Sequence, residues 1–190
     1  MNTMEIKKEN LLAAYNGASD EQKQLLKTLF GKETFKPKNI MDRIKTFEDA
    51  WKELGDDHPL VREWDSFDNL SPDLEAFLKL RIITAALNEG WEPQFTKGER
   101  RWYCWYDFIT KEQYDKLDEE DKARVVGRGG YNAYAYVGLV CAYAHYVSSH
   151  SGASGGSRLA FKSAELAKYA AKRFIEIYVD FCFKADGKAE

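Results

Sequence analysis

Residues 101–109, RWYCWYDFI, carry the pattern that decides how this chain folds. Large apolar side chains occupy both the even-numbered and the odd-numbered positions of this stretch. A run of aromatic residues with a period of two predicts a strand that is apolar on both faces. Such a strand needs cover on two sides, so we expect helices on one face and a ligand or a partner on the other.

Upstream of this strand the sequence has the signals of helices. Ser19 and Thr46 each begin a capping box, and helix-breaking residues follow at short intervals, which predicts a series of short helices over 1–66. A longer helix is predicted over 72–88, because it opens with proline, carries apolar residues at helical spacing and has Gly90 just past its end.

Downstream of the strand, Gly-rich loops alternate with further strand candidates. Residues 126–138, VGRGGYNAYAYVG, and 139–147, LVCAYAHYV, are rich in strand-forming residues, and SRLAF at 157–161 predicts a short third strand. The Ser/Gly-rich stretch 149–157 is typical of a flexible loop. Apolar residues then recur at helical spacing, which predicts a final helix over 164–183.

Together these patterns predict an α+β fold, in which a helical N-terminal half packs with a small, mainly antiparallel sheet and a C-terminal helix. A length of 190 residues suits one domain. We therefore expect a single domain over 1–190, with short helices over 1–66, an α+β core over 71–184 and a frayed tail over 185–190.

Charge and hydropathy restrict the partners. No apolar run approaches the roughly 20 residues that span a bilayer, and the charged N-terminus has no signal-peptide pattern. We therefore expect no membrane partner and no export. A net charge of −3 argues against general attraction to nucleic acid. Residues 124–184, however, hold eight Lys or Arg against three Asp or Glu, so a local basic face is expected there.

Cysteine and histidine spacing predicts no disulfide framework, no metal site and no cofactor. The three cysteines are far apart in apolar stretches, which is typical of reduced, buried thiols. The three histidines lack the HxxxH and HExxH spacings of zinc ligands. A nucleophilic Cys104 or Cys141 paired with His145 is the catalytic alternative. No catalytic residue is assigned, and the chain is predicted to be a binding protein rather than an enzyme.

A Gly-rich loop followed by cations is the first candidate site. In residues 152–163, GASGGSRLAFKS, the side chains of Ser157, Arg158 and Lys162 stand between this loop and the start of a helix. Loop N–H groups, a helix dipole and an arginine are suited to bind phosphate. The segment matches neither GxxxxGK[ST] nor GxGxxG, so a plain hairpin loop followed by a capped helix is the alternative.

Clustered aromatic residues form the second candidate. Eleven of the 27 aromatic residues fall within 102–146, close in sequence to several arginines. Exposed aromatic rings beside arginine stack nucleic-acid bases, so Arg101, Trp105, Arg128 and Tyr131 are candidate ligand-binding residues. The alternative is that these rings belong to the hydrophobic core, as aromatic residues in strands usually do.

A family resemblance rests on five strings: KTLFGKETFKPK, KTFEDAWKELG, KLRIITAALNEGWEPQF, RWYCWYDF and GSRLAFKSAELAKYAAKRFIEIYVDF. Through them, nearly the whole chain resembles a family of uncharacterised proteins encoded by bacteriophages and prophages of gut Bacteroidetes. The resemblance implies a phage or prophage origin and a place in the cytoplasm of the host bacterial cell or, alternatively, in a virion. It implies no activity, cofactor or site residue.

The leading functional hypothesis is a non-enzymatic phage accessory protein that binds nucleic acid, a nucleotide or a host protein through its basic, aromatic C-terminal half. A virion structural or assembly protein is the alternative. A small enzyme acting on a phosphorylated ligand through Ser157, Arg158 and His145 is the third. Exposed Arg and Trp along one groove favour the first, and a broad apolar patch favours the second.

Overall fold

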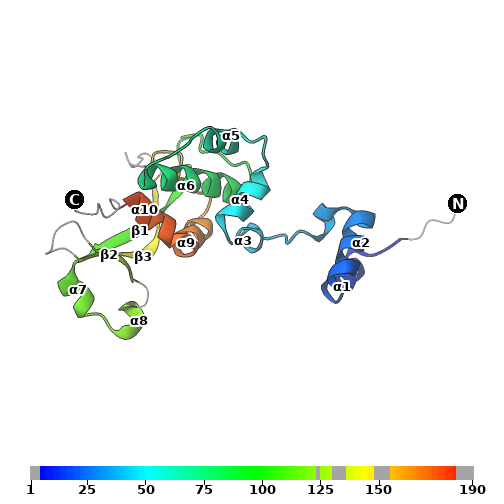
Figure 1. The fold of residues 1–190 in the computed structure, drawn as a ribbon, viewed down its shortest axis with the longest axis horizontal. Helices are drawn as coiled ribbons and strands as arrows, with labels where there is room; N and C mark the ends of the chain where they lie inside the picture. Colours follow the sequence, from blue (N-terminus) through cyan, green and yellow to red (C-terminus); the bar gives the residue numbers. More distant parts are fainter. Residues whose placement is uncertain (1–4, 123–124, 130–135, 148–154, 183–190) are drawn as a thin grey trace. The chain divides into compact units, whose positions relative to one another are not determined.

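A computed structural model of the chain describes residues 5–122, 125–129, 136–147 and 155–182 (Figure 1). Contacts between residues group the chain into two compact units, Met1–Arg43 and Ile44–Glu190, whereas the sequence analysis treated 1–190 as one domain. Helices make up most of the described residues, so the helical part of the predicted α+β fold is confirmed.

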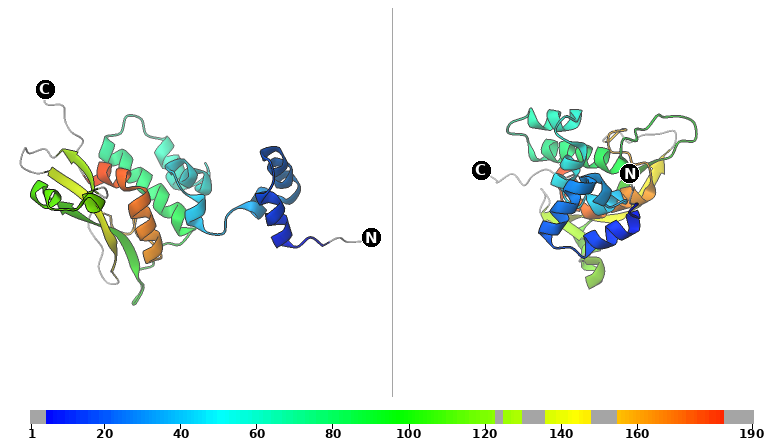
Figure 2. Two further views of the ribbon diagram at one scale, coloured as in Figure 1. Left: turned by 90° about the horizontal axis from the view of Figure 1, so that it is seen from below. Right: turned by 90° about the vertical axis from the view of Figure 1, so that its right-hand side faces the viewer.

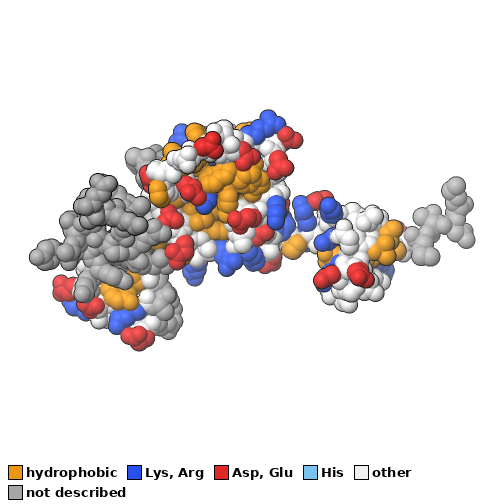
Figure 3. All heavy atoms as spheres, in the orientation of Figure 1, with side chains coloured by type: hydrophobic (Ala, Val, Ile, Leu, Met, Phe, Trp, Pro, Cys, Tyr) orange, Lys and Arg blue, Asp and Glu red, His pale blue; other side chains and the backbone are white. Residues whose placement is uncertain are grey.

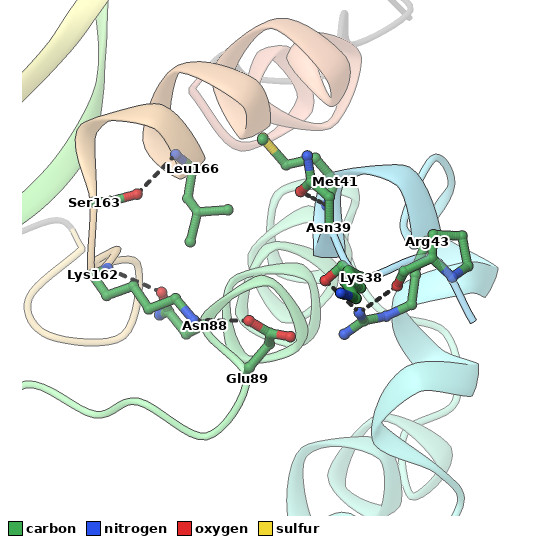
Figure 4. Close-up of polar contacts among 10 residues, drawn as sticks. Lys38, Asn39, Met41, Arg43, Asn88, Glu89, Lys162, Ser163 and Leu166 are labelled. Atoms are coloured by element: carbon green, nitrogen blue, oxygen red, sulfur yellow. Dashed lines mark hydrogen bonds and ion pairs between the residues drawn. The ribbon is translucent and has the colours of Figure 1, made fainter. Parts of the chain in front are cut away.

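The smaller unit consists of short helices: α1 (Lys8–Asn16), α2 (Asp20–Phe30), the 3-10 helix η1 (Lys32–Phe35) and α3 (Ile40–Arg43). The capping box predicted at Ser19 is confirmed, since its hydroxyl accepts from the N–H of Gln22 and its own N–H donates to the Gln22 side chain. Arg43 donates to the carbonyls of Pro37 and Lys38, which ties α3 to the segment before it (Figure 4).

Helix α2 carries an apolar stripe that is exposed. Leu25 and Leu29 are 58% and 65% exposed, and α2 has no buried residue. Within this unit Tyr15 stacks on the buried Phe35, with ring centroids 4.3 Å apart. The unit is thus held partly by one aromatic pair rather than by the leucine face of its longest helix.

The larger unit begins with α4 (Phe47–Leu54), α5 (Pro59–Asp65) and α6 (Pro72–Asn88). Helix α6 has the bounds predicted from the sequence. The capping box at Thr46 is also confirmed, with Asp49 as its acidic partner. His58 caps α5, because its Nδ1 accepts from the N–H of Leu60 at 3.2 Å.

Three antiparallel strands follow: β1 (Arg101–Ile109), β2 (Val125–Gly129) and β3 (Tyr136–Val147), in the order β1-β3-β2. Strands β1 and β3 cover the two stretches with the clearest strand patterns. The register of this pair shifts between Trp105 and Tyr106, which is the mark of a bulge. Two short helices, α7 (Lys111–Asp115) and α8 (Glu119–Lys122), follow β1 in the chain.

The prediction of a third strand at 157–161 is wrong. Residues 155–159 form turns, in which Arg158 N–H donates to Gly155 O and Ala160 N–H donates to Ser157 O. Gly156 has a φ of +54°, which turns the backbone away from an extended path. Only Phe161 pairs with β1, in a single bridge to Trp102. Most of the predicted loop 149–157 lies outside the described residues.

The final helix, predicted as continuous over 164–183, is broken into α9 (Ala164–Arg173) and α10 (Ile175–Cys182). Phe174 stands at the break with φ −114° and ψ 26°, and its side chain is buried. Around the break, α9 contacts chiefly β1 and β3, whereas α10 contacts chiefly α6.

The larger unit is layered, with α9 and α10 between the sheet and α6 (Figure 2). Its central cluster consists of Leu80, Leu159, Tyr178 and Val179, to which the half-buried Cys104 and Tyr106 of β1 add their side chains. The helical N-terminal half was predicted to pack with the sheet, and for α6 this packing is made through the C-terminal helices. Among the described helices none is long and apolar enough to cross a membrane.

Candidate functional site

One face of α6 differs from the rest of the helix. Leu80, Ile82, Ile83 and Leu87 are buried in the core, as expected for an apolar helix. Arg81, Thr84, Ala85 and Asn88 have the spacing i, i+3, i+4 and i+7, which places them on a single face. This mixed polar stripe forms one wall of a cleft in the larger unit.

The cleft has a volume of about 280 Å³, near the lower end of the range for small-molecule sites. Its walls come from α6, the start of α5, the segment after α6 and the turn before α9. The lining residues are Leu60, Arg81, Thr84, Ala85, Asn88, Trp91, Glu92, Pro93, Ser157, Arg158 and Ala160. Guanidinium, hydroxyl, carboxylate and indole groups therefore meet in one small space.

Asn88 fixes two of these walls to each other (Figure 4). Its Nδ2 donates to the carbonyl of Ala160 at 2.8 Å. Its Oδ1 accepts from the N–H of Lys162 at 3.0 Å, the bond that Figure 4 shows. The neighbouring Glu89 forms an ion pair with Lys162 Nζ at 3.0 Å. Asn88 is buried, so both amide ends exchange solvent for protein partners.

Arg81 and Thr84 have different surroundings on the same wall. Arg81 Nη1 lies 2.8 Å from Glu63 Oε1, so its charge is balanced by α5. Thr84 is only 3% exposed, and within the described parts of the chain its Oγ1 has no hydrogen-bond partner. Leaving a buried hydroxyl in this state has a free-energy cost, which sets Thr84 apart from the other polar side chains of α6.

Arg158 and Glu92 are the two cleft residues whose charges are not engaged. Both side chains are exposed, and across the described residues neither makes a hydrogen bond or an ion pair through its charged group. Arg158 is carried by the turn at Gly156, where a Cβ would lie 3.8 Å from Arg158 Nη1. The cleft thus offers one guanidinium and one carboxylate to a ligand.

The segment between α6 and β1 is organised by Glu99. Its carboxylate accepts from the N–H groups of Gln94 at 3.0 Å and Phe95 at 2.7 Å, and from Arg101 Nη1 at 3.2 Å. These bonds, chiefly the one from Gln94, lower the pKa of Glu99 despite some desolvation. They also hold Phe95 at a φ of +56°, a backbone conformation that is uncommon for a bulky residue.

The structure brings together only two of the seven predicted ligand-binding residues, Ser157 and Arg158. Arg101 is 1% exposed and lies against Phe95, with the guanidinium carbon 4.3 Å from the ring centroid. Trp105 is exposed on β1 but does not line the cleft. Lys162 is held by Glu89. The Arg128 side chain and all of Tyr131 lie outside the described residues.

The helix start after the Gly-rich loop is satisfied within the chain. Ser163 caps α9 by accepting from the N–H of Leu166 at 3.3 Å. Together with the Lys162–Glu89 pair, this leaves Arg158 and Ser157 as the groups of the predicted phosphate site that line the cleft. In the view of Figure 3, acidic and basic side chains are interspersed over the larger unit.

The residues that the sequence analysis missed are Arg81, Asn88, Trp91 and Glu92. A signal for the first two was present, because a polar stripe with helical spacing interrupts an otherwise apolar helix. Trp91 and Glu92 directly follow the helix stop at Gly90, in a stretch without strand or helix periodicity. Their approach to the turn before α9 depends on tertiary packing, for which local sequence holds no signal.

Cys104, the candidate nucleophile of the catalytic alternative, is a packing residue. Its Sγ lies 3.2 Å from the carbonyl oxygen of Ala167 and 3.0 Å from the hydroxyl oxygen of Tyr178. Tyr178 is buried, and burial raises its pKa well above the usual value. The side chains of Cys141 and His145 lie outside the described residues. In the described part of the chain, no three His, Cys, Asp or Glu residues are grouped so as to hold a metal ion.

Comparison with known proteins adds no further constraint: no family model, no curated protein and no solved structure matches this chain.

Proposed function

We propose that this chain is an α+β accessory protein of a bacteriophage or prophage, and that it binds a small phosphate-bearing ligand in the cleft beside α6. The phage origin rests on the family resemblance of the sequence. The binding function rests on one observation: Arg158, Ser157 and Trp91 line the same cleft, and the Arg158 guanidinium is not engaged by any described residue.

The chemistry of these groups favours a phosphate. A guanidinium presents a planar set of donors that matches two phosphate oxygens, and it keeps its charge at any physiological pH. The Ser157 hydroxyl adds a donor two residues after Gly155, where the turn carries no bulky side chain. The half-buried indole of Trp91 provides an apolar surface for a planar group of the ligand.

The size of the cleft favours a mononucleotide over the other two partners considered, nucleic acid and a host protein. About 280 Å³ suits one small molecule. A protein partner needs an interface of roughly 800 Å² on each side, which a cleft of this size does not supply by itself. Arg158 is exposed in this groove, as the first functional hypothesis expects, whereas Trp91 is half-buried rather than exposed.

The lining residues favour binding over catalysis. The described lining includes no Cys, His or Lys, so Ser157 has no neighbouring base of the usual kind in the cleft. Glu92 is the one carboxylate among these residues. A ligand can therefore be held and oriented without a group suited to attack it.

The experiment is a titration of the purified chain with nucleoside monophosphates and inorganic phosphate, followed by tryptophan fluorescence and calorimetry. Arg158→Ala should weaken nucleotide binding by about tenfold to a hundredfold, the effect of one charge-assisted hydrogen-bonding group. Its melting temperature should stay close to that of the parent, because an exposed, unengaged arginine contributes little to stability. Added salt should weaken binding to the parent.

Arg62→Ala is the matched control. Arg62 lies on α5, is exposed, pairs with Asp57 and does not line the cleft. This variant should bind nucleotides as the parent does. The proposal fails if the parent binds none of the ligands, or if Arg158→Ala binds them as tightly as Arg62→Ala.

A further inference from the structure

Two opposite charges line the cleft without neutralising each other. Glu92 and Arg158 are both lining residues, yet neither pairs with the other or with another described residue. Elsewhere on this wall the ionic and amide groups are engaged, Arg81 with Glu63 and Asn88 with Ala160 and Lys162. A ligand that is anionic at one end and rich in N–H donors at the other would satisfy both charges.

The backbone that carries Glu92 is held in place. Trp91 N–H donates to the carbonyl of Asn88 at 3.0 Å, and the carbonyl of Glu92 accepts from Gln94 Nε2 at 3.3 Å. Pro93 fixes its own φ and restricts the residue before it to extended conformations. The backbone at Glu92 is therefore fixed, and the exposed Glu92 side chain lines the same cleft as Trp91.

A carboxylate at this position discriminates between bases. An ionised carboxylate has two acceptor oxygens and no donor. Guanine presents two adjacent N–H donors, N1–H and N2–H, on its pairing edge, which match these oxygens in parallel. Adenine and cytosine present one amino donor beside a ring acceptor, and uracil presents one donor between two acceptors. Each of these three bases would place an acceptor lone pair against the carboxylate.

We propose that Glu92 selects guanine, so that the ligand of the cleft is a guanine nucleotide with its phosphate at Arg158 and Ser157, its base on Trp91 and its N1–H and N2–H donating to Glu92. This assignment rests on the proposed function, because it requires that a phosphate-bearing ligand binds in the cleft. It adds the identity of the base and the residue that recognises it.

The test compares the affinities for GMP, AMP, CMP and UMP in the parent and in Glu92→Gln. The parent should bind GMP at least about tenfold more tightly than AMP, the value of one well-placed pair of hydrogen bonds. Glutamine offers one acceptor and one donor, so Glu92→Gln should lose this preference and shift toward AMP. The ratio of the two affinities is the readout, because a general change in charge affects all four nucleotides alike.

Glu176→Gln is the control, since Glu176 is exposed at the start of α10 and does not line the cleft. It should keep the parent's preference. Equal binding of all four nucleotides by the parent, with the Arg158→Ala effect intact, would overturn the guanine assignment and leave the phosphate site standing. A GMP preference that persists in Glu92→Gln would overturn it as well. Absence of binding to every nucleotide would overturn both proposals.

Discussion

The side chain of Asn88 is joined to the backbone of Lys162, 74 positions further along the chain, by a hydrogen bond of 3.0 Å from the Lys162 N–H to Asn88 Oδ1. The other end of the same amide donates to Ala160 O at 2.8 Å. The Asn88 amide thus donates to and accepts from the backbone of residues 160–162, as a peptide group of a neighbouring strand would. The turn carrying Arg158 is thereby attached to the end of α6.

Replacing Asn88 should destabilise the larger unit and loosen the cleft. Asn88→Ala leaves a buried carbonyl and a partly buried N–H without partners, at a cost of about 2 to 5 kcal/mol. Asn88→Asp keeps the acceptor for Lys162 but replaces the donor for Ala160 with a buried carboxylate oxygen facing that carbonyl, so its loss should be at least as large. Urea denaturation measures both. Asn10→Ala, at an exposed site in α1, is the control, and an Asn88→Ala variant as stable as this control would contradict the role assigned to the amide.

Acid should release the segment held by Glu99. Because the pKa of Glu99 is lowered below its usual 4.5 in the folded chain, its contribution to stability is fully present above that value and is lost as the pH falls through the lowered pKa. Glu99→Gln should therefore melt below the parent at pH 7, and the difference should shrink below about pH 4. Thermal melts at pH 7, 5, 4 and 3 test this. A gap that stays constant over this range would show that the carboxylate charge is not the cause.

Much of the local structure follows from chain-local rules. A capping box begins a helix at each of three residues, Ser19, Thr46 and Thr110. In each box the hydroxyl and the side chain three residues later accept hydrogen bonds from N–H groups at the helix start, which have no acceptor within the helix. Pro72 and the apolar periodicity likewise delimit α6. These signals act within one or two turns of chain, which is why a single sequence reveals them.

The candidate site depends on contacts that local sequence patterns do not predict. SRLAF has strand-forming residues, but the Gly156 turn and the Asn88 amide hold this segment irregular. Arg101 stands beside aromatic residues in the sequence, yet Glu99 and Phe95 bury it. Phe174 continues the helical period, but the helix breaks there, and α9 packs chiefly on β1 and β3 whereas α10 packs chiefly on α6. For SRLAF and Phe174 a partner distant in sequence decides the outcome, whereas Arg101 is buried by residues that lie two and six positions before it.

The last prediction concerns the buried hydroxyl of Thr84. Valine has nearly the same shape as threonine, and within the described residues Thr84 Oγ1 has no hydrogen-bond partner. Thr84→Val should therefore replace a poorly satisfied polar atom with a methyl group and raise the stability by about 1 to 2 kcal/mol. The residue stays β-branched, so the constraint on χ1 within α6 is retained. Urea denaturation at neutral pH measures the change.

Thr84→Ser separates the hydroxyl from the methyl group. This variant keeps the buried hydroxyl and removes a methyl, so it should lose about 1 kcal/mol of stability. Nucleotide affinity should be the same in both variants as in the parent, because the Thr84 hydroxyl is buried beneath the cleft surface whereas Arg158 is exposed. If Thr84→Val is instead less stable than the parent, the hydroxyl has a hydrogen-bond partner in solution. If Thr84→Val keeps its stability but binds nucleotides more weakly, the hydroxyl reaches the ligand and belongs with Arg158 among the binding residues.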